Sequence, residues 1–137
     1  MIEAINRQTT FKIDLARFRG LLRRLVRHYG LTKTEVALVF VDNRAIRKLN
    51  RDFRKKDAPT DVLSFAYGER GPDGIFYLGD IIISAAKAHD ASRRLGHSLD
   101  RELEYLIIHG FLHLLGFEHF QGHEGEGKKI RRLMVKD

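Results

Sequence analysis

The spacing of hydrophobic residues changes several times along the chain, and each change predicts a different element. From Leu15 to Leu25 the apolar residues recur every three or four positions, which is the period of an amphipathic helix. Asp14 is the expected N-cap of this helix. Gly30, which readily adopts the left-handed conformation, is expected to end it. The arginines between these apolar positions predict a solvated basic face on the helix, with RNA contact as the alternative.

Four short segments have the pattern of β-strands. Residues 35–41 (EVALVFV) form a β-branched run between turn signals, and residues 2–6 (IEAIN) are assigned to the same sheet. Residues 61–67 (DVLSFAY) and 75–84 (IFYLGDIIIS) flank the turn-rich segment 68–74 (GERGPDG). This arrangement predicts an antiparallel hairpin.

The remaining segments have helical spacing. They are residues 42–53 with Asp42 as N-cap, 84–96, 99–115 ended by Gly116, and 124–135. Strands and helices together predict an α/β (α+β) fold in which helices pack on a mixed sheet of about four strands. The whole chain, residues 1–137, is expected to form one domain, because its length lies within the usual range of a single domain.

Composition narrows the class of protein. Hydrophobic residues make up 43% of the chain, which is enough for a real core, and 25 Lys and Arg outnumber 18 Asp and Glu. The net charge of +7 favours a polyanionic partner, although a soluble protein with a basic surface would show the same value. The N-terminus lacks a secretion-signal pattern and no apolar run approaches the roughly 20 residues of a membrane span. We therefore expect a cytoplasmic protein with no membrane partner.

The absence of cysteine excludes disulfides and thiolate metal sites, so a transition-metal site must use histidine and carboxylate. In HGFLHLLGFEH, His109 and His113 are four residues apart and project to one side of the predicted helix. Gly116 then lets the chain turn back, so that His119 can approach the same point. These positions match the ligands and glycine of the zincin pattern HExxHxxGxxH. Three nitrogen ligands leave a zinc ion one open position, as in catalytic sites, whereas hydrogen-bonded core histidines are the alternative.

Gly110 stands where the protease form of this pattern has its general-base glutamate. Hydrolysis of a phosphodiester depends at least as much on neutralising its negative charge as on a separate general base. A metal can also supply hydroxide, because it lowers the pKa of its bound water to about 7. Arginine matches phosphate oxygens with two parallel hydrogen bonds. Arg54 is the candidate, in a basic segment that we expect to be a loop between a helix and a strand (NRDFRKKDAPTDVLSF). Composition alone does not distinguish it from its basic neighbours Arg51, Lys55 and Lys56.

Three motifs, HGFLHLLGFEH, PTDVLSF and LGDIIIS, closely resemble those of the YbeY family of single-strand-specific metallo-endoribonucleases. The resemblance implies one zinc ion per chain, bound by His109, His113 and His119, and a functional arginine at Arg54. It implies action in ribosomal RNA maturation, at the 3′ end of the small-subunit RNA, and in ribosome quality control. The implied partners are single-stranded RNA, the ribosome or its assembly factors, with no DNA expected.

The chain departs from the family pattern at three positions. Phe117 and Glu118 replace the usual Tyr and Asp, and Ala66 follows LSF where proline is common. Glu118 keeps its chemical type and can orient an imidazole or a water, while Ala66 affects only the local turn.

Two other functions compete with the nuclease. One is a zincin-type metallopeptidase, which the ligand spacing favours and Gly110 opposes. The other is a non-catalytic RNA-binding ribosome assembly factor whose zinc is structural, with the fourth metal position filled by His123 or Glu118. In the main hypothesis His97 and His123 are ordinary polar residues, and Asp80, inside an apolar strand, requires a partner that the sequence does not name.

Overall fold

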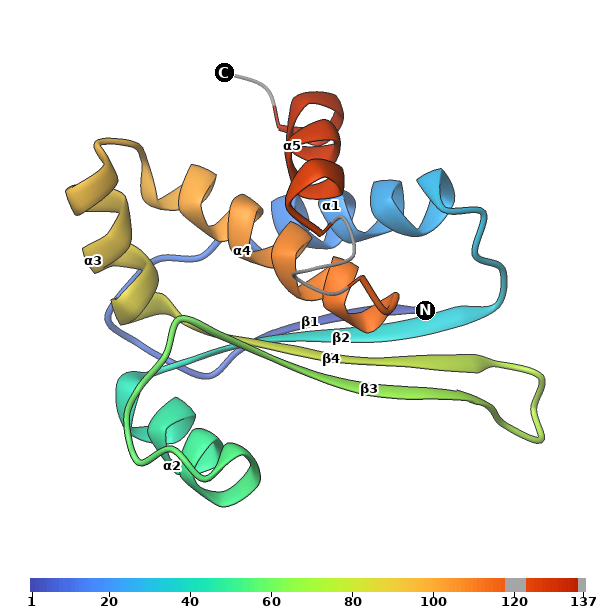
Figure 1. Ribbon diagram of the computed structural model, residues 1–137, viewed down its shortest axis with the longest axis horizontal. Helices are drawn as coiled ribbons and strands as arrows, with labels where there is room; N and C mark the ends of the chain where they lie inside the picture. The colour runs from blue at the N-terminus through green and yellow to red at the C-terminus, as the bar shows by residue number, and fades with distance from the viewer. Residues whose placement is uncertain (118–122, 136–137) are drawn as a thin grey trace.

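The computed structural model describes residues 1–117 and 123–135, and Figure 1 shows their arrangement. The elements in chain order are β1 (Ile2–Asn6), α1 (Leu15–His28), β2 (Thr34–Val41), α2 (Asn43–Arg54), β3 (Val62–Arg70), β4 (Phe76–Ser84), α3 (Ala85–Leu95), α4 (Leu99–Leu114) and α5 (His123–Met134). Every strand and helix expected from the hydrophobic pattern is present, with ends that differ by a few residues at most.

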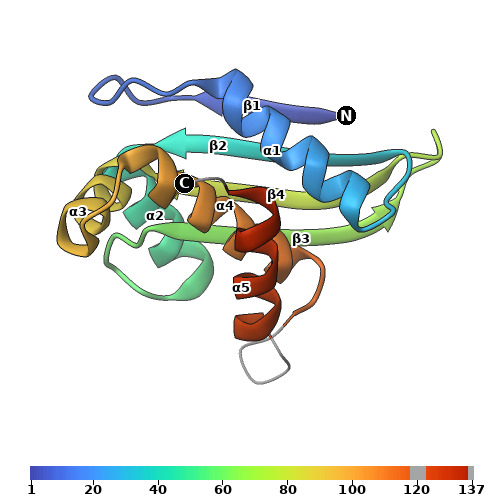
Figure 2. The same ribbon diagram turned by 90° about the horizontal axis from the view of Figure 1, so that it is seen from above.

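The four strands form one mixed sheet in the order β1-β2-β4-β3. β2 pairs in parallel with both β1 and β4, and β3 pairs with β4 in antiparallel orientation. The predicted hairpin and the mixed four-stranded sheet are thus confirmed. Because β3 comes last in this order, its outer side is an edge of the sheet, as Figure 2 shows.

The hairpin is longer than the sequence indicated. Residues 68–70 were expected to belong to the turn, but β3 continues to Arg70, which pairs with Phe76. A register shift between Ala66 and Glu69 absorbs the extra residues, and Gly68 lies inside it with a φ of +63°. The glycine that resembled a turn signal therefore belongs to a β-bulge, where positive φ is also required.

Helices cover the two faces of the sheet unequally. On one face lie α1 and α4, with α5 packed against them, and on the other lies α2 (Figures 1 and 2). The main core between the sheet and α1, α4 and α5 includes the fully buried rings of Phe18, Phe40 and Phe111. Val41, Ile46 and Leu63 form a smaller cluster under α2. None of the helices in the described residues is both long and apolar enough to cross a membrane.

The N-caps expected from the sequence are confirmed. The side chain of Asp14 accepts a hydrogen bond from the backbone N–H of Arg17 at 3.3 Å, and that of Asp42 accepts one from Ala45 at 2.9 Å. Each cap satisfies one of the backbone donors that the first helical turn leaves without a partner. The second cap marks the start of α2, whose last residue, Arg54, reaches β3 with its side chain.

Two contacts attach α5 to α1. The hydroxyl of Tyr29, next to the C-terminus of α1, donates to the carboxylate of Glu126, and the guanidinium of Arg24 donates to the carbonyl of Met134 at 2.9 Å. Burial raises the pKa of Tyr29, and the hydrogen bond to Glu126 raises it further. The folded protein therefore holds the Tyr29 proton more tightly than the unfolded chain does.

We expect Tyr29→Phe to lower the free energy of unfolding by about 1 kcal/mol at neutral pH, because the bond to Glu126 is lost. Above about pH 10 the unfolded tyrosine ionises while the folded one keeps its proton, so this stabilisation decreases as pH rises. The stability difference between the wild type and the variant should shrink accordingly. Melting temperatures of both proteins between about pH 8 and about pH 11 test this, and a constant difference would contradict it.

Candidate active site

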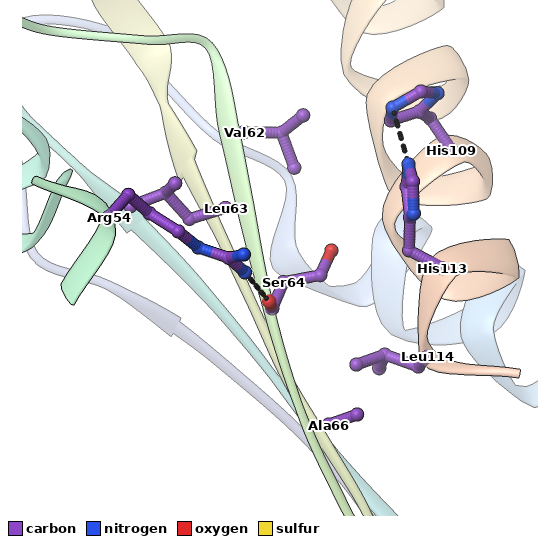
Figure 3. A pocket seen from close by; sticks show the side chains of 8 residues that line it. All are labelled: Arg54, Val62, Leu63, Ser64, Ala66, His109, His113 and Leu114. Atoms are coloured by element: carbon purple, nitrogen blue, oxygen red, sulfur yellow. Dashed lines mark hydrogen bonds between the residues drawn. The ribbon is translucent and has the colours of Figure 1, made fainter. Parts of the chain in front are cut away.

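Two of the three predicted metal ligands lie one turn apart on α4. The Nε2 atoms of His109 and His113 are 3.2 Å apart, and their rings meet edge to face with centroids 4.6 Å apart. His113 is exposed and His109 is half-buried. The pair therefore presents two nitrogens toward one point at an accessible surface (Figure 3).

The distance between these nitrogens fits a shared zinc ion. An imidazole nitrogen binds zinc at about 2.0–2.1 Å, so two such ligands at a tetrahedral angle are roughly 3.3–3.4 Å apart. The third predicted ligand, His119, and its neighbour Glu118 lie outside the described residues. Residues 1–117 and 123–135 contain no set of three histidine or acidic side chains that could hold a metal. The zinc site therefore stays a prediction. Its two described ligands, His109 and His113, have the nitrogen spacing that a shared zinc ion requires.

The histidine pair faces a cavity of about 380 Å³. Its lining consists of Arg54, Val62, Leu63, Ser64, Ala66, His109, His113 and Leu114. Figure 3 shows that α4 supplies one wall with the two imidazoles, while β3 and the side chain of Arg54 form the opposite wall. The fold thus brings Arg54 and the histidine pair, far apart in sequence, to one site.

Arg54 is held in place by the edge of the sheet. Its Nη2 donates to the backbone carbonyl of Ser64 at 2.7 Å, and its guanidinium lies 5.4 Å from the centroid of the Phe65 ring. The sequence placed Arg54 in a loop, but it is the last residue of α2, and Lys55 ends the helix with a φ of +61°. A helix end gives the side chain a better defined origin than a loop does.

The loop that follows Arg54 is fixed by Asn50. The Asn50 side chain is buried and donates to the carbonyl of Ala58 at 2.9 Å, and the backbone carbonyl of Asn50 accepts from the N–H of Lys56. Arg47 also binds Asp57 at 2.8 Å, which holds the pKa of that carboxyl below its usual range. These contacts orient the segment between Arg54 and β3.

Ser64 is a site residue that the sequence reasoning missed. Its backbone carbonyl accepts from Arg54, and its hydroxyl donates to the carbonyl of Gly110 at 3.2 Å. Ser64 therefore connects the arginine wall of the cavity to the histidine helix. In the sequence, Ser64 could have been noticed as a polar residue between Leu63 and Phe65, inside a strand whose other residues are mostly apolar.

Gly110 lets α4 approach the sheet beside the site. A Cβ atom at this position would lie 2.8 Å from Cγ2 of Ile81 and 3.0 Å from Oγ of Ser64. The first of these distances is closer than any normal contact of a side chain in a packed interior. A glutamate at residue 110, as in the protease pattern, has no room here.

We expect Gly110→Ala to lower the free energy of unfolding by about 1–3 kcal/mol, because the added methyl group pushes α4 away from β3 and β4. Gly20→Ala is the matched control, since Gly20 lies inside α1 and a Cβ there meets nothing within 4 Å. The control should be neutral or stabilise by up to about 1 kcal/mol. Urea unfolding measures both changes, and equal stabilities of the two variants would contradict the close packing.

Other predicted residues lie outside this cavity. Asp80 has a partner that the sequence did not name, because the Tyr67 hydroxyl donates to its carboxylate at 2.5 Å, and this bond raises the pKa of Tyr67. His97 contacts Glu102, with Nε2 and Oε1 2.6 Å apart, as expected of an ordinary polar residue. His123 begins α5, and its side chain lies outside the described part of the chain.

The chain resembles known proteins over most of its length. The family model described as "Endoribonuclease YbeY" matches residues 3–135. A protein of that name from Aquifex aeolicus is 49% identical over 104 residues, which cover 76% of this chain and 68% of the relative. One from Oceanobacillus iheyensis is 48% identical over 112 residues, covering 75% and 72%. One from Geobacillus kaustophilus is 53% identical over 93 residues, covering 62% and 60%.

The fold also resembles a solved structure. The solution structure of TM1509 from Thermotoga maritima matches with a TM-score of 0.60 and 23% identity, over 97% of this chain and 91% of that one. At this identity the match concerns the fold alone.

Proposed function

The chain belongs to the endoribonuclease YbeY family, and from this premise we propose that it cuts single-stranded RNA internally at a zinc ion held by His109, His113 and His119. The family places the chain among hydrolases that act on RNA. One observation carries the proposal. A histidine pair with the nitrogen spacing of a zinc site and the guanidinium of Arg54 face one cavity of about 380 Å³.

The donor set suits zinc, because imidazole is one of its preferred ligands and the chain has no thiolate to offer. When bound, the ion would supply a Lewis acid that polarises a phosphoryl oxygen and lowers the pKa of a water molecule. His109 and His113 hold one side of this position from a rigid helix. Arg54 faces them from the opposite wall, so a phosphodiester in the cavity would lie between the two groups (Figure 3).

Arg54 binds and orients the phosphate in this mechanism. Guanidinium has five N–H donors in a planar fork, and the bond to Ser64 uses one of them. That bond and the Phe65 ring fix the plane of the fork before RNA arrives. A pre-oriented cation costs little reorganisation when negative charge builds up on the phosphoryl oxygens.

The wider role rests on the family resemblance and on charge. A net charge of +7 supports long-range attraction to RNA. We propose that the substrate is ribosomal RNA, cut near the 3′ end of the small-subunit RNA and during ribosome quality control. The partners would then be the ribosome or its assembly factors, in the cytoplasm.

Cleavage of an end-labelled RNA, offered as a single strand or as a perfect duplex, tests the proposal. The purified protein, loaded with zinc, should cut the single strand internally and leave the duplex intact. Removal of the metal by a chelator should stop cleavage, and added zinc should restore it. Tight RNA binding without any cleavage, with chelation causing the protein to unfold, would instead support a non-catalytic assembly factor. Hydrolysis of casein would support a peptidase.

A further inference from the structure

A second cavity, of about 230 Å³, lies on the other side of His109. Val62 and His109 line both cavities, so the two cavities are neighbours. The rest of the second cavity comes from Asp61 just before β3, from Leu95 at the end of α3, and from α4 and α5, which contribute Tyr105, Leu106 and Arg131 among others. None of these residues has a role in the mechanism proposed above.

The wall of this second cavity includes a stacked cation and ring. The guanidinium of Arg131 lies 4.8 Å from the centroid of the Tyr105 ring, and both side chains are half-buried. The Nε atom of Arg131 is buried, and no acceptor among the described residues bonds to it. A buried donor without an acceptor costs free energy unless a further group satisfies it.

The chemistry of the lining favours a nucleobase over a phosphate. Asp61 adds negative charge, which repels a phosphate, and Glu102, also in the lining, is engaged by His97 at 2.6 Å. Leu106 and Val62 provide apolar surface beside the stacked pair. Flat bases stack on aromatic rings and on guanidinium planes, and carboxylates accept hydrogen bonds from their amino groups.

We propose that this second cavity binds the base of the nucleotide next to the scissile phosphate. The base stacks against the Arg131–Tyr105 pair, and Asp61 accepts a hydrogen bond from its exocyclic amino group. Cytosine, adenine and guanine therefore fit better than uracil, which lacks that group. This inference rests on the proposed function, because an RNA chain that is cut internally must continue past the histidine site on both sides.

Binding of fluorescein-labelled oligocytidine of roughly ten nucleotides to the zinc-loaded protein tests the stacking. We expect Arg131→Ala and Tyr105→Leu each to weaken binding about tenfold, while Tyr105→Phe, which keeps the ring, binds like the wild type. Arg132→Ala is the matched control, because Arg132 has the same charge, is exposed and lies outside the cavity lining. It should weaken binding by less than about twofold. Equal effects of Arg131→Ala and Arg132→Ala would overturn the proposal.

Base preference provides the second readout. The wild type should bind oligocytidine more tightly than oligouridine, and Asp61→Asn should reduce that preference by about threefold or more, because an amide can also donate to uracil. An unchanged preference in Asp61→Asn would exclude the role of its carboxylate. If the wild type binds and cuts RNA but the variants behave like their control, only this inference fails. If the wild type neither binds nor cuts RNA, the proposed function fails first.

Discussion

Replacing His113 by alanine is expected to remove zinc from the protein and to lower the rate of RNA cleavage by about 10³-fold or more. His113 supplies one of the two Nε2 atoms that lie 3.2 Å apart, and a metal site with one nitrogen fewer loses both affinity and geometry. His109→Ala should have the same effect. Metal content by mass spectrometry and cleavage of a labelled single strand, measured on the same samples, test both variants.

His28→Ala is the control for these variants. His28 is exposed and ends α1, where its ring meets that of Tyr29, and it does not line the cavity. Its replacement should leave zinc content and cleavage unchanged. Cleavage that persists in His113→Ala at the wild-type rate would mean a contaminating nuclease or a reaction elsewhere on the molecule. Loss of zinc with full cleavage would separate the metal from the chemistry and would refute the proposed site.

Replacing Arg54 by alanine is expected to lower kcat by about 10²–10³-fold while zinc content stays at one ion per chain. The variant keeps both histidines but loses the charge that faces them across the cavity. Arg54→Lys should recover little of the rate, because an ammonium group cannot form the two parallel bonds of a guanidinium. Single-turnover cleavage at saturating enzyme measures the chemical step without the contribution of binding.

Arg51→Ala controls for the loss of one positive charge on the same helix. Arg51 is exposed one turn before Arg54, and its Nε contacts Asp52 at 3.2 Å rather than β3. We expect a small change in binding that salt screens, and no change in kcat. If Arg54→Ala and Arg51→Ala had the same modest effect, Arg54 would serve only general attraction to RNA.

The elements of the fold could be predicted because their signals are local. The period of apolar residues in α1 and α4, the caps at Asp14 and Asp42, and the turn residues between β3 and β4 are all visible within short windows. The order β1-β2-β4-β3 could not be predicted in this way, because it depends on which distant strands pair. For the same reason the position of α2, opposite the other helices, came only from the structure.

The candidate site could be predicted only in part, for a similar reason. Histidine spacing along one helix is a local signal, and it predicted that His109 and His113 lie on one side of α4, as the structure shows. The bond from Ser64 to the carbonyl of Gly110 joins residues 46 positions apart, so no pattern within a segment reveals it. The stacking of Arg131 on Tyr105 likewise joins two helices whose sequences show only apolar periodicity and charge.

The bond from Arg54 to the Ser64 carbonyl also affects how this protein behaves at high concentration. β3 is an edge strand, and its outer backbone groups are a template on which another copy of the chain can add a strand and begin to aggregate. Arg54 occupies one of these carbonyls and places a charge there, so that an incoming strand meets both a missing acceptor and a cation. Substitutions at this position are therefore expected to leave the edge of β3 more open to pairing with a second copy of the chain, an effect separate from any change in activity.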